Sequence, residues 1–140
     1  MDRQTAAARD EQQWEREYDS LMEIARKNLD PAWEHGEVVV LKTTKGNTYA
    51  APIPDYWDPE IREPLENRCI QQMVDAGDTE VFCCLATVKG KVPEILSWNF
   101  RSRLIEVNQS NLRTECFLWG GGEVILIKPF SALLPPKKKA

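Results

Sequence analysis

The run Val81-Phe82-Cys83-Cys84-Leu85-Ala86-Thr87-Val88 constrains the fold more than any other stretch, because it is apolar at nearly every position. Side chains on a strand alternate between two faces, so a strand without polar alternation is covered on both faces. Residues 38–41, Val-Val-Val-Leu, have the same character. The chain therefore needs a buried sheet, and its 140 residues, 42% of them hydrophobic, suffice for one domain with its own core.

The first segment favours a helix over residues 5–29, ended by Asp30-Pro31 because a residue before proline avoids helical geometry. One apolar stripe follows the helical repeat, and its members are Trp14, Tyr18, Leu21, Ala25 and Leu29. Such a stripe most often packs on the protein's own core, and less often on a partner. We take Trp14, Tyr18 and Leu21 as partner-binding candidates.

The next segments predict a hairpin with strands at 38–41 and 48–53, and Pro52 and Pro54 place the return strand at a sheet edge. Asp58-Pro59-Glu60 resembles a helix start, but Pro64 would interrupt that helix. The sequence therefore predicts a short turn followed by a helix over residues 64–76. Strands at 80–88 and 91–96, joined by Lys89-Gly90, form the second hairpin.

Ser97 can cap a helix in which Phe100, Leu104 and Val107 share a face. The stretch "EILSWNF" also alternates like a strand, so residues 97–108 are open between helix and strand, with helix favoured. Strands at 114–119 and 123–127 flank Gly120-Gly121-Gly122, which is typical of a hairpin turn.

These elements predict an α+β domain with a mostly antiparallel sheet of about six strands. Three hairpins, each preceded by a helix, supply the strands, and the helices are expected on one face. We divide the chain into an N-terminal amphipathic helix (1–30), an α+β domain (31–130) and a flexible basic tail (131–140). The N-terminus lacks an export signal, and the four cysteines suit a reducing compartment, so we expect a cytoplasmic protein.

The four cysteines are interpreted as packing. Cys83 and Cys84 point to opposite faces of their strand and cannot grip one metal ion, and no Cys-x-x-Cys pair occurs. His35, the only histidine, is far away in sequence and lacks metal-ligand spacing with Glu34 and Glu37. A cysteine-dependent enzyme using Cys83 or Cys84 with His35 is the least favoured alternative. We expect no catalytic residue, metal or cofactor.

Charge is unevenly distributed along the chain, although the net value is only −4. Residues 53–80 carry eight acidic residues against two arginines, whereas residues 81–113 carry five basic residues against two acidic ones. A nucleotide- or nucleic-acid-binding protein is an alternative that is not favoured, since aromatic faces stack on bases and guanidinium groups bind phosphate. Its candidate residues are Trp98, Asn99, Arg101, Arg103, Arg113 and Gly121.

Tyr56-Trp57 is an aromatic pair between prolines and is added to the partner-binding candidates. With the long helix, the opposed charges and no catalytic constellation, the sequence favours a small non-catalytic interaction module. We expect it to bind a protein partner and to form a homo-oligomer, without a membrane.

Overall fold

The computed structural model describes residues 11–134. Its helices are α1 (Glu11–Asn28), α2 (Pro59–Asp75) and α3 (Trp98–Val107). The strands are β1 (Glu37–Thr43), β2 (Thr48–Ile53), β3 (Val81–Val88), β4 (Pro93–Glu94), β5 (Glu115–Trp119) and β6 (Ile125–Pro129). A 3-10 helix, η2 (Gln109–Arg113), lies between α3 and β5, and another, η3 (Phe130–Leu133), follows β6.

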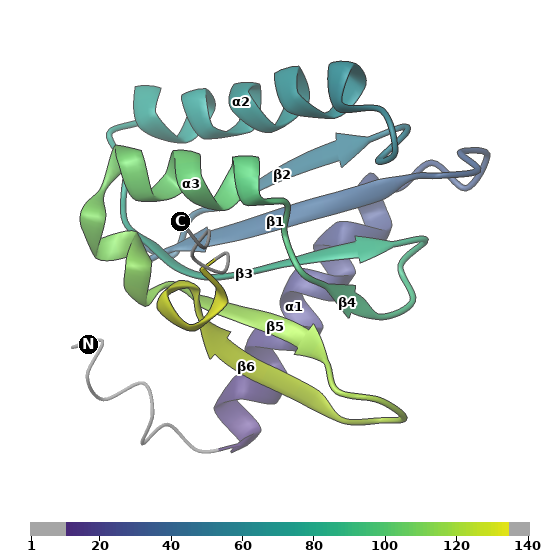
Figure 1. The fold of residues 1–140 in the computed structure, drawn as a ribbon. Coiled ribbons are helices and arrows are strands. Elements are labelled where there is room, and N and C mark those ends of the chain that lie inside the picture. The colour runs from purple at the N-terminus through teal and green to yellow at the C-terminus, as the bar shows by residue number, and fades with distance from the viewer. Residues whose placement is uncertain (1–10, 135–140) are drawn as a thin grey trace, which may run out of the picture.

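The six strands form one mixed sheet in the order β2-β1-β3-β5-β6, with β4 paired to β3 (Figure 1). All pairs are antiparallel except β3 with β5, which run parallel with Cys84 opposite Cys116. The α+β class is therefore confirmed, but the sheet is not purely antiparallel. Its edge at β2 contains Pro52, as predicted, because a proline cannot donate to a neighbouring strand.

The second hairpin is much shorter than predicted. Only Pro93 and Glu94 pair with β3, in place of a strand over residues 91–96. Pro93 has no N–H to continue the hydrogen bonding between the strands. The Val92 carbonyl accepts from the Thr87 hydroxyl at 2.9 Å, so this carbonyl bonds to a side chain. The chain then turns directly into α3.

Helices cover both faces of the sheet, so the prediction of helices on one face is wrong. In Figure 1, α2 and α3 lie on the near side and α1 crosses behind the strands. Val39 and Leu41 belong to the core under α2 and α3, whereas Val38 and Val40 belong to the core under α1. The strands are apolar on both faces, and each face needs its own cover.

The second helix begins at Pro59, five residues before its predicted start at Pro64, so the predicted interruption at Pro64 is wrong. The Asp58 carboxylate accepts the Glu60 N–H at 3.0 Å, and Pro59 occupies the first turn. Pro64 removes one internal hydrogen bond, which costs about 3 kcal/mol in a free helix. The cap, together with the burial of Cys69, Ile70 and Met73, outweighs that loss.

Residues 97–108 form the favoured helix, with Ser97 as the cap of α3 and Phe100 and Leu104 buried. The glycine turn joins β5 to β6 as predicted, and Gly121 (φ 99°) and Gly122 (φ 56°) adopt conformations that favour glycine. The predicted start of the first helix at Thr5 and most of the basic tail lie outside the described residues. No helix between residues 11 and 134 combines the length and apolar character needed to cross a bilayer.

Candidate functional site

Glu66 is a charged residue on the buried face of α2, with no solvent exposure. The Ser97 hydroxyl donates to its Oε2 at 2.7 Å, and the Asn99 side-chain amide donates to its Oε1 at 3.0 Å. Both donors lie at the start of α3, where the helix dipole favours a negative charge. Glu66 therefore ties α2 to the N-terminus of α3.

Arg62, one turn before Glu66 on α2, is the cation of the site. Its Nε lies 3.8 Å from Glu66 Oε2, and its Nη1 donates to the Tyr56 carbonyl at 2.9 Å. The Nε atom is buried without a hydrogen-bond partner. A buried N–H without an acceptor is costly, so this donor is available to another group.

Glu37, the first residue of β1, is a second buried carboxyl beside this cluster, with 7% of its surface exposed. Burial, and next the Glu66 carboxylate, raise the pKa of Glu37 to about 7, and Arg62 opposes that rise. Its side chain has no hydrogen bond or ion pair with another residue in the described range. It is thus a nearly buried acid without a hydrogen-bond partner between residues 11 and 134, and its pKa is about 7.

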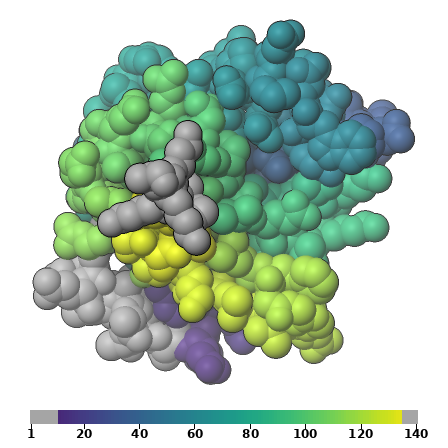
Figure 2. All heavy atoms as spheres, in the orientation of Figure 1, coloured from purple at the N-terminus to yellow at the C-terminus, as the bar shows by residue number. Residues whose placement is uncertain are grey.

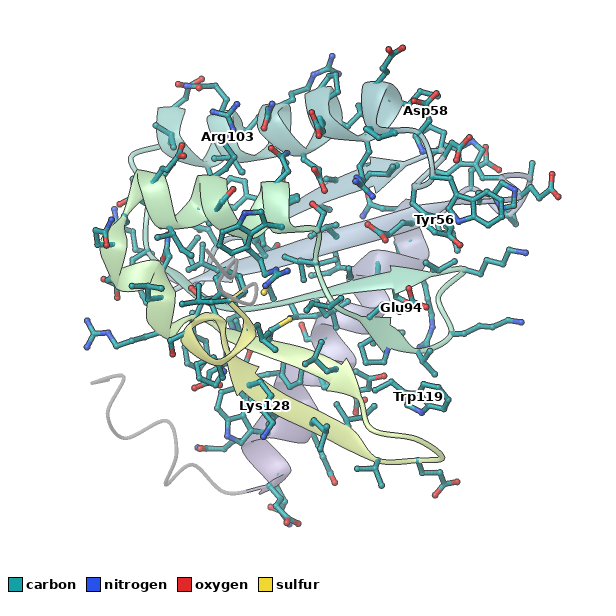
Figure 3. All side chains as sticks on the ribbon, viewed as in Figure 1. Tyr56, Asp58, Glu94, Arg103, Trp119 and Lys128 are labelled. Carbon is teal, nitrogen blue, oxygen red and sulfur yellow. The ribbon has the colours of Figure 1, made fainter. Side chains whose placement is uncertain are left out.

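Glu37, Arg62, Glu66, Ser97 and Asn99 form what we call the carboxylate site. It lies on the face of the sheet covered by α2 and α3, which pack side by side (Figure 2). In Figure 3, Tyr56, just before α2, and Glu94, on β4, lie on the right of the view. Arg103, on α3, lies at the upper left. Two carboxyls, one held by hydrogen bonds and one free, can act as an acid–base pair because their environments differ.

No family model matches the sequence, and no curated protein is similar to it. The fold, however, resembles solved structures of cytidine deaminases. The enzyme from Mycobacterium leprae matches with a TM-score of 0.65 at 13% identity, over 85% of this chain and 98% of its own. That from Burkholderia pseudomallei matches with a TM-score of 0.61 at 16% identity, over 84% and 95%. The fold is cytidine deaminase-like.

The enzyme from Bacillus anthracis also matches, with a TM-score of 0.58 at 16% identity, over 82% of this chain and 84% of its own. These likenesses overturn the prediction of a non-catalytic protein-interaction module. The chain has an α+β fold that solved enzymes share, and its buried carboxyl pair lies inside that fold. Glu37 and Glu66 lie on different elements, so no fixed spacing along the chain marks them as a pair.

Zinc deaminases bind their metal through a His-x-Glu and a Pro-Cys-x-x-Cys segment, with the glutamate acting as acid and base. His35-Gly36-Glu37 has the spacing of the first segment, but the His35 ring stacks on Trp57 at 4.0 Å, and no Pro-Cys-x-x-Cys segment exists. Within residues 11–134, no group of three or more His, Cys, Asp or Glu side chains could hold a metal ion. The donor set does not fit zinc, and we assign no step to it.

The predicted Arg and aromatic patch is only partly at the surface. Arg101 is 7% exposed, and it donates from Nε to the Leu96 carbonyl at 3.0 Å and from Nη1 to the Leu133 carbonyl. Burial lowers the pKa of Arg101, and its guanidinium lies 5.2 Å from the Trp98 ring centre. Arg103 and Arg113 are exposed, and Gly121 lies in the β5–β6 turn. A ligand-binding role for these residues stays a prediction.

The predicted partner-binding residues fall in two places. Trp14, Tyr18 and Leu21 pack on the sheet's own core under α1. Tyr56 packs against the other core, whereas Trp57 is 65% exposed and stacks on His35. The structure holds one chain, so the predicted homo-oligomer stays a prediction.

All four cysteines are buried thiols outside any disulfide, as the packing interpretation requires. Cys84 lies in the core under α2 and α3, and Cys83 in the core under α1, on opposite faces of β3. Burial raises the pKa of Cys84 and brings that of Cys69 to about 12. Cys69 and Cys84 are therefore poor nucleophiles, which argues against a cysteine-dependent enzyme that uses Cys84.

Glu66 and Glu37 were both missed as site residues, although each leaves a signal. Glu66 shares the apolar face of α2 with Cys69, Ile70 and Met73, at spacings of three, four and seven. A carboxylate on a core-facing stripe needs buried partners. Glu37 directly precedes the apolar residues of β1, which places it at the end of a buried strand.

Proposed function

We propose that this protein binds an aminopyrimidine nucleoside, the class to which cytidine belongs, at the carboxylate site. In this proposal the protonated Glu37 carboxyl donates a hydrogen bond to the ring nitrogen of the base and accepts one from its amino group. The observation that carries the proposal is the unpaired, nearly buried Glu37 carboxyl with a pKa of about 7. The likeness to structures described as cytidine deaminases supports the choice of ligand class.

A carboxyl group that holds its proton near neutral pH offers an O–H donor beside a carbonyl acceptor. The pairing edge of cytosine offers a ring-nitrogen acceptor beside an amino donor, so the two edges are complementary. An ionised carboxylate has only acceptors, so it cannot donate a hydrogen bond to the ring nitrogen. The protonated form of Glu37 is therefore the form that binds the base.

The Glu66 carboxylate favours the protonated form of Glu37. Ser97 and Asn99 hold the Glu66 carboxylate in place, so its negative charge stays close to Glu37. A like charge nearby disfavours ionisation of a second carboxyl. Glu66 is thus a positioning residue that acts on Glu37, and the Arg62 Nε atom, which has no hydrogen-bond partner, is a donor for a ligand oxygen.

Isothermal titration calorimetry with cytidine at pH 6 and pH 8 tests this proposal. With a Glu37 pKa of about 7, the protonated fraction falls about tenfold between these values, so the affinity should fall about tenfold. Cytidine does not change its own charge in this range. Uridine, which lacks the basic ring nitrogen, should bind more weakly at both values.

Glu37→Gln is the decisive variant, because an amide offers a donor and an acceptor at every pH. It should bind cytidine with the same affinity at pH 6 and pH 8. The matched control is Glu94→Gln, which changes an exposed neighbour and should keep the pH dependence. Absence of cytidine binding at pH 6, or a pH dependence that survives in Glu37→Gln, contradicts the proposal.

A further inference from the structure

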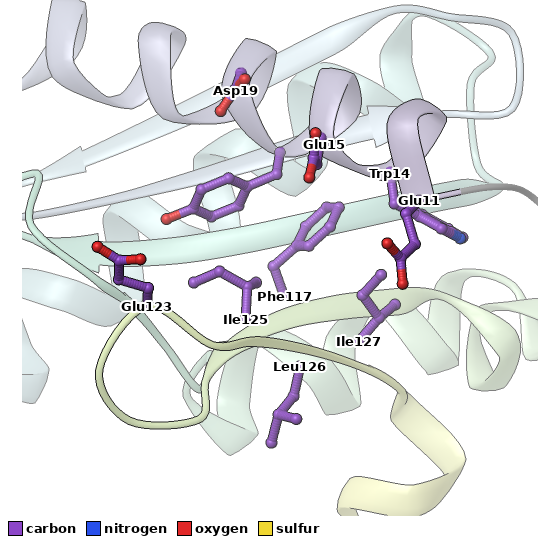
Figure 4. Close-up of a pocket in the computed structure, with 10 residues that line it drawn as sticks. Glu11, Trp14, Glu15, Asp19, Phe117, Glu123, Ile125, Leu126 and Ile127 are labelled. Atoms are coloured by element: carbon purple, nitrogen blue, oxygen red, sulfur yellow. The ribbon is translucent and has the colours of Figure 1, made fainter.

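A cavity lies on the face of the sheet opposite the carboxylate site, between α1 and the β5–β6 hairpin. Its volume is about 580 Å³, which is in the usual range for small-molecule sites. Figure 4 shows Phe117, Ile125 and Ile127 pointing into the space under α1 and Leu126 pointing away. α1 packs mainly on β1, β2 and β3, so the apolar side of the hairpin is left open beneath the start of the helix.

The walls of this cavity are aromatic. Trp14 lies against Phe117 with ring centres 5.8 Å apart, and Tyr18 lies 5.6 Å from the same ring. Trp14 also stacks on Phe82 at 5.6 Å. These contacts pack the rings of Trp14, Tyr18 and Phe117 against one another, so the cavity has an aromatic wall.

The rim of the cavity is acidic. Glu11, Glu15 and Asp19 project from α1, and Glu123 projects from the hairpin (Figure 4). None of the lining residues is Lys, Arg or His. The cavity therefore combines an aromatic interior with a negative entrance, and no cation of the described chain lines it.

We propose that this cavity, the α1–hairpin cavity, binds a small organic cation with an apolar body. A quaternary or alkylated ammonium group is attracted by aromatic faces and loses little hydration when it enters an apolar space. The carboxylates at the rim raise its local concentration and disfavour anions. The proposal rests on the cavity and its walls and is independent of the carboxylate site.

Calorimetry with choline as the probe tests the proposal, with 3,3-dimethylbutan-1-ol as its neutral isostere. Both have nearly the same shape, so a difference in binding reports the positive charge. Choline should bind saturably and at least about fivefold more tightly than the neutral alcohol. The double variant Glu15→Gln/Asp19→Asn should weaken choline binding about fivefold or more, because it removes two rim charges.

The matched control is Glu23→Gln, which removes one carboxylate from the same helix outside the cavity, where Glu23 pairs with exposed Lys27. It should leave choline binding unchanged. Glu15 and Asp19 are exposed, and circular dichroism checks that the double variant keeps its helix. No saturable choline binding up to about 10 mM, equal binding of the neutral alcohol, or unchanged binding in the double variant overturns the proposal.

Discussion

The two faces of the sheet differ in where their charged side chains lie. Under α2 and α3, Glu37, Glu66 and Arg101 are almost completely buried. Under α1, the core is apolar, and carboxylates such as Glu15 and Asp19 remain at the exposed rim. Charges removed from water need fixed partners, whereas rim charges keep their hydration. The first face therefore holds ionisable groups inside the core, whereas the second holds carboxylates at a hydrated rim.

The largest effect in this comparison is expected from Glu66→Ala. The variant leaves the Ser97 and Asn99 donors and the Arg62 cation without their acceptor. Loss of one partner of a buried charge network costs about 3–5 kcal/mol, so the free energy of unfolding in urea should fall by that amount. Glu15→Ala at the rim is the control and should change it by less than about 0.5 kcal/mol. Equal effects would remove the difference between the faces.

Glu37→Gln should stabilise the protein in a pH-dependent way. The pKa of Glu37 is raised from 4.5 to about 7, so the folded state binds the extra proton between these values, and stability falls as pH rises through this window. The amide cannot ionise. It should therefore gain about 3 kcal/mol at pH 8 and almost nothing at pH 4, as measured by urea unfolding at both values. A gain that is equal at both would refute the role of ionisation.

Ser97→Ala tests the link between the helices with a smaller effect. The hydroxyl donates to Glu66 and accepts the Phe100 N–H at 3.1 Å, so its loss removes a helix cap and a charged hydrogen bond. We expect a loss of about 1–2 kcal/mol in thermal or urea unfolding. Ser102→Ala, on the same helix, removes only a bond to the Asn99 carbonyl and should cost clearly less.

The smallest effect belongs to the α1 side. Glu17 on α1 accepts from the Lys42 ammonium at 2.7 Å, with 17% and 26% of the two side chains exposed. Glu17→Gln should reduce stability by less than about 1 kcal/mol, and the difference should shrink in about 1 M salt. A loss as large as that of Glu66→Ala would show that α1 also depends on a charge pair.

Most of the fold could be predicted from local pattern. The turn at Gly121, the edge position of Pro52 and the cap at Ser97 all depend on neighbouring residues, and the structure contains them. The wrong predictions concern interactions between residues that are far apart in the sequence. Pro64 should interrupt a helix, yet burial of the apolar face of α2 keeps it intact. The carboxylate site was missed because residues 37, 66 and 97 meet only in the folded chain.

The sequence by itself determined that β1 and β3 are buried strands, that the cysteines are packing residues and that residues 97–108 favour a helix. These properties follow from side-chain alternation and capping, which act over a few residues. Only the tertiary structure decided that helices cover both faces, that β3 and β5 run parallel, and that Glu37 lies beside Glu66. A pKa depends on burial and on charges from distant segments, and these exist only after the chain has packed.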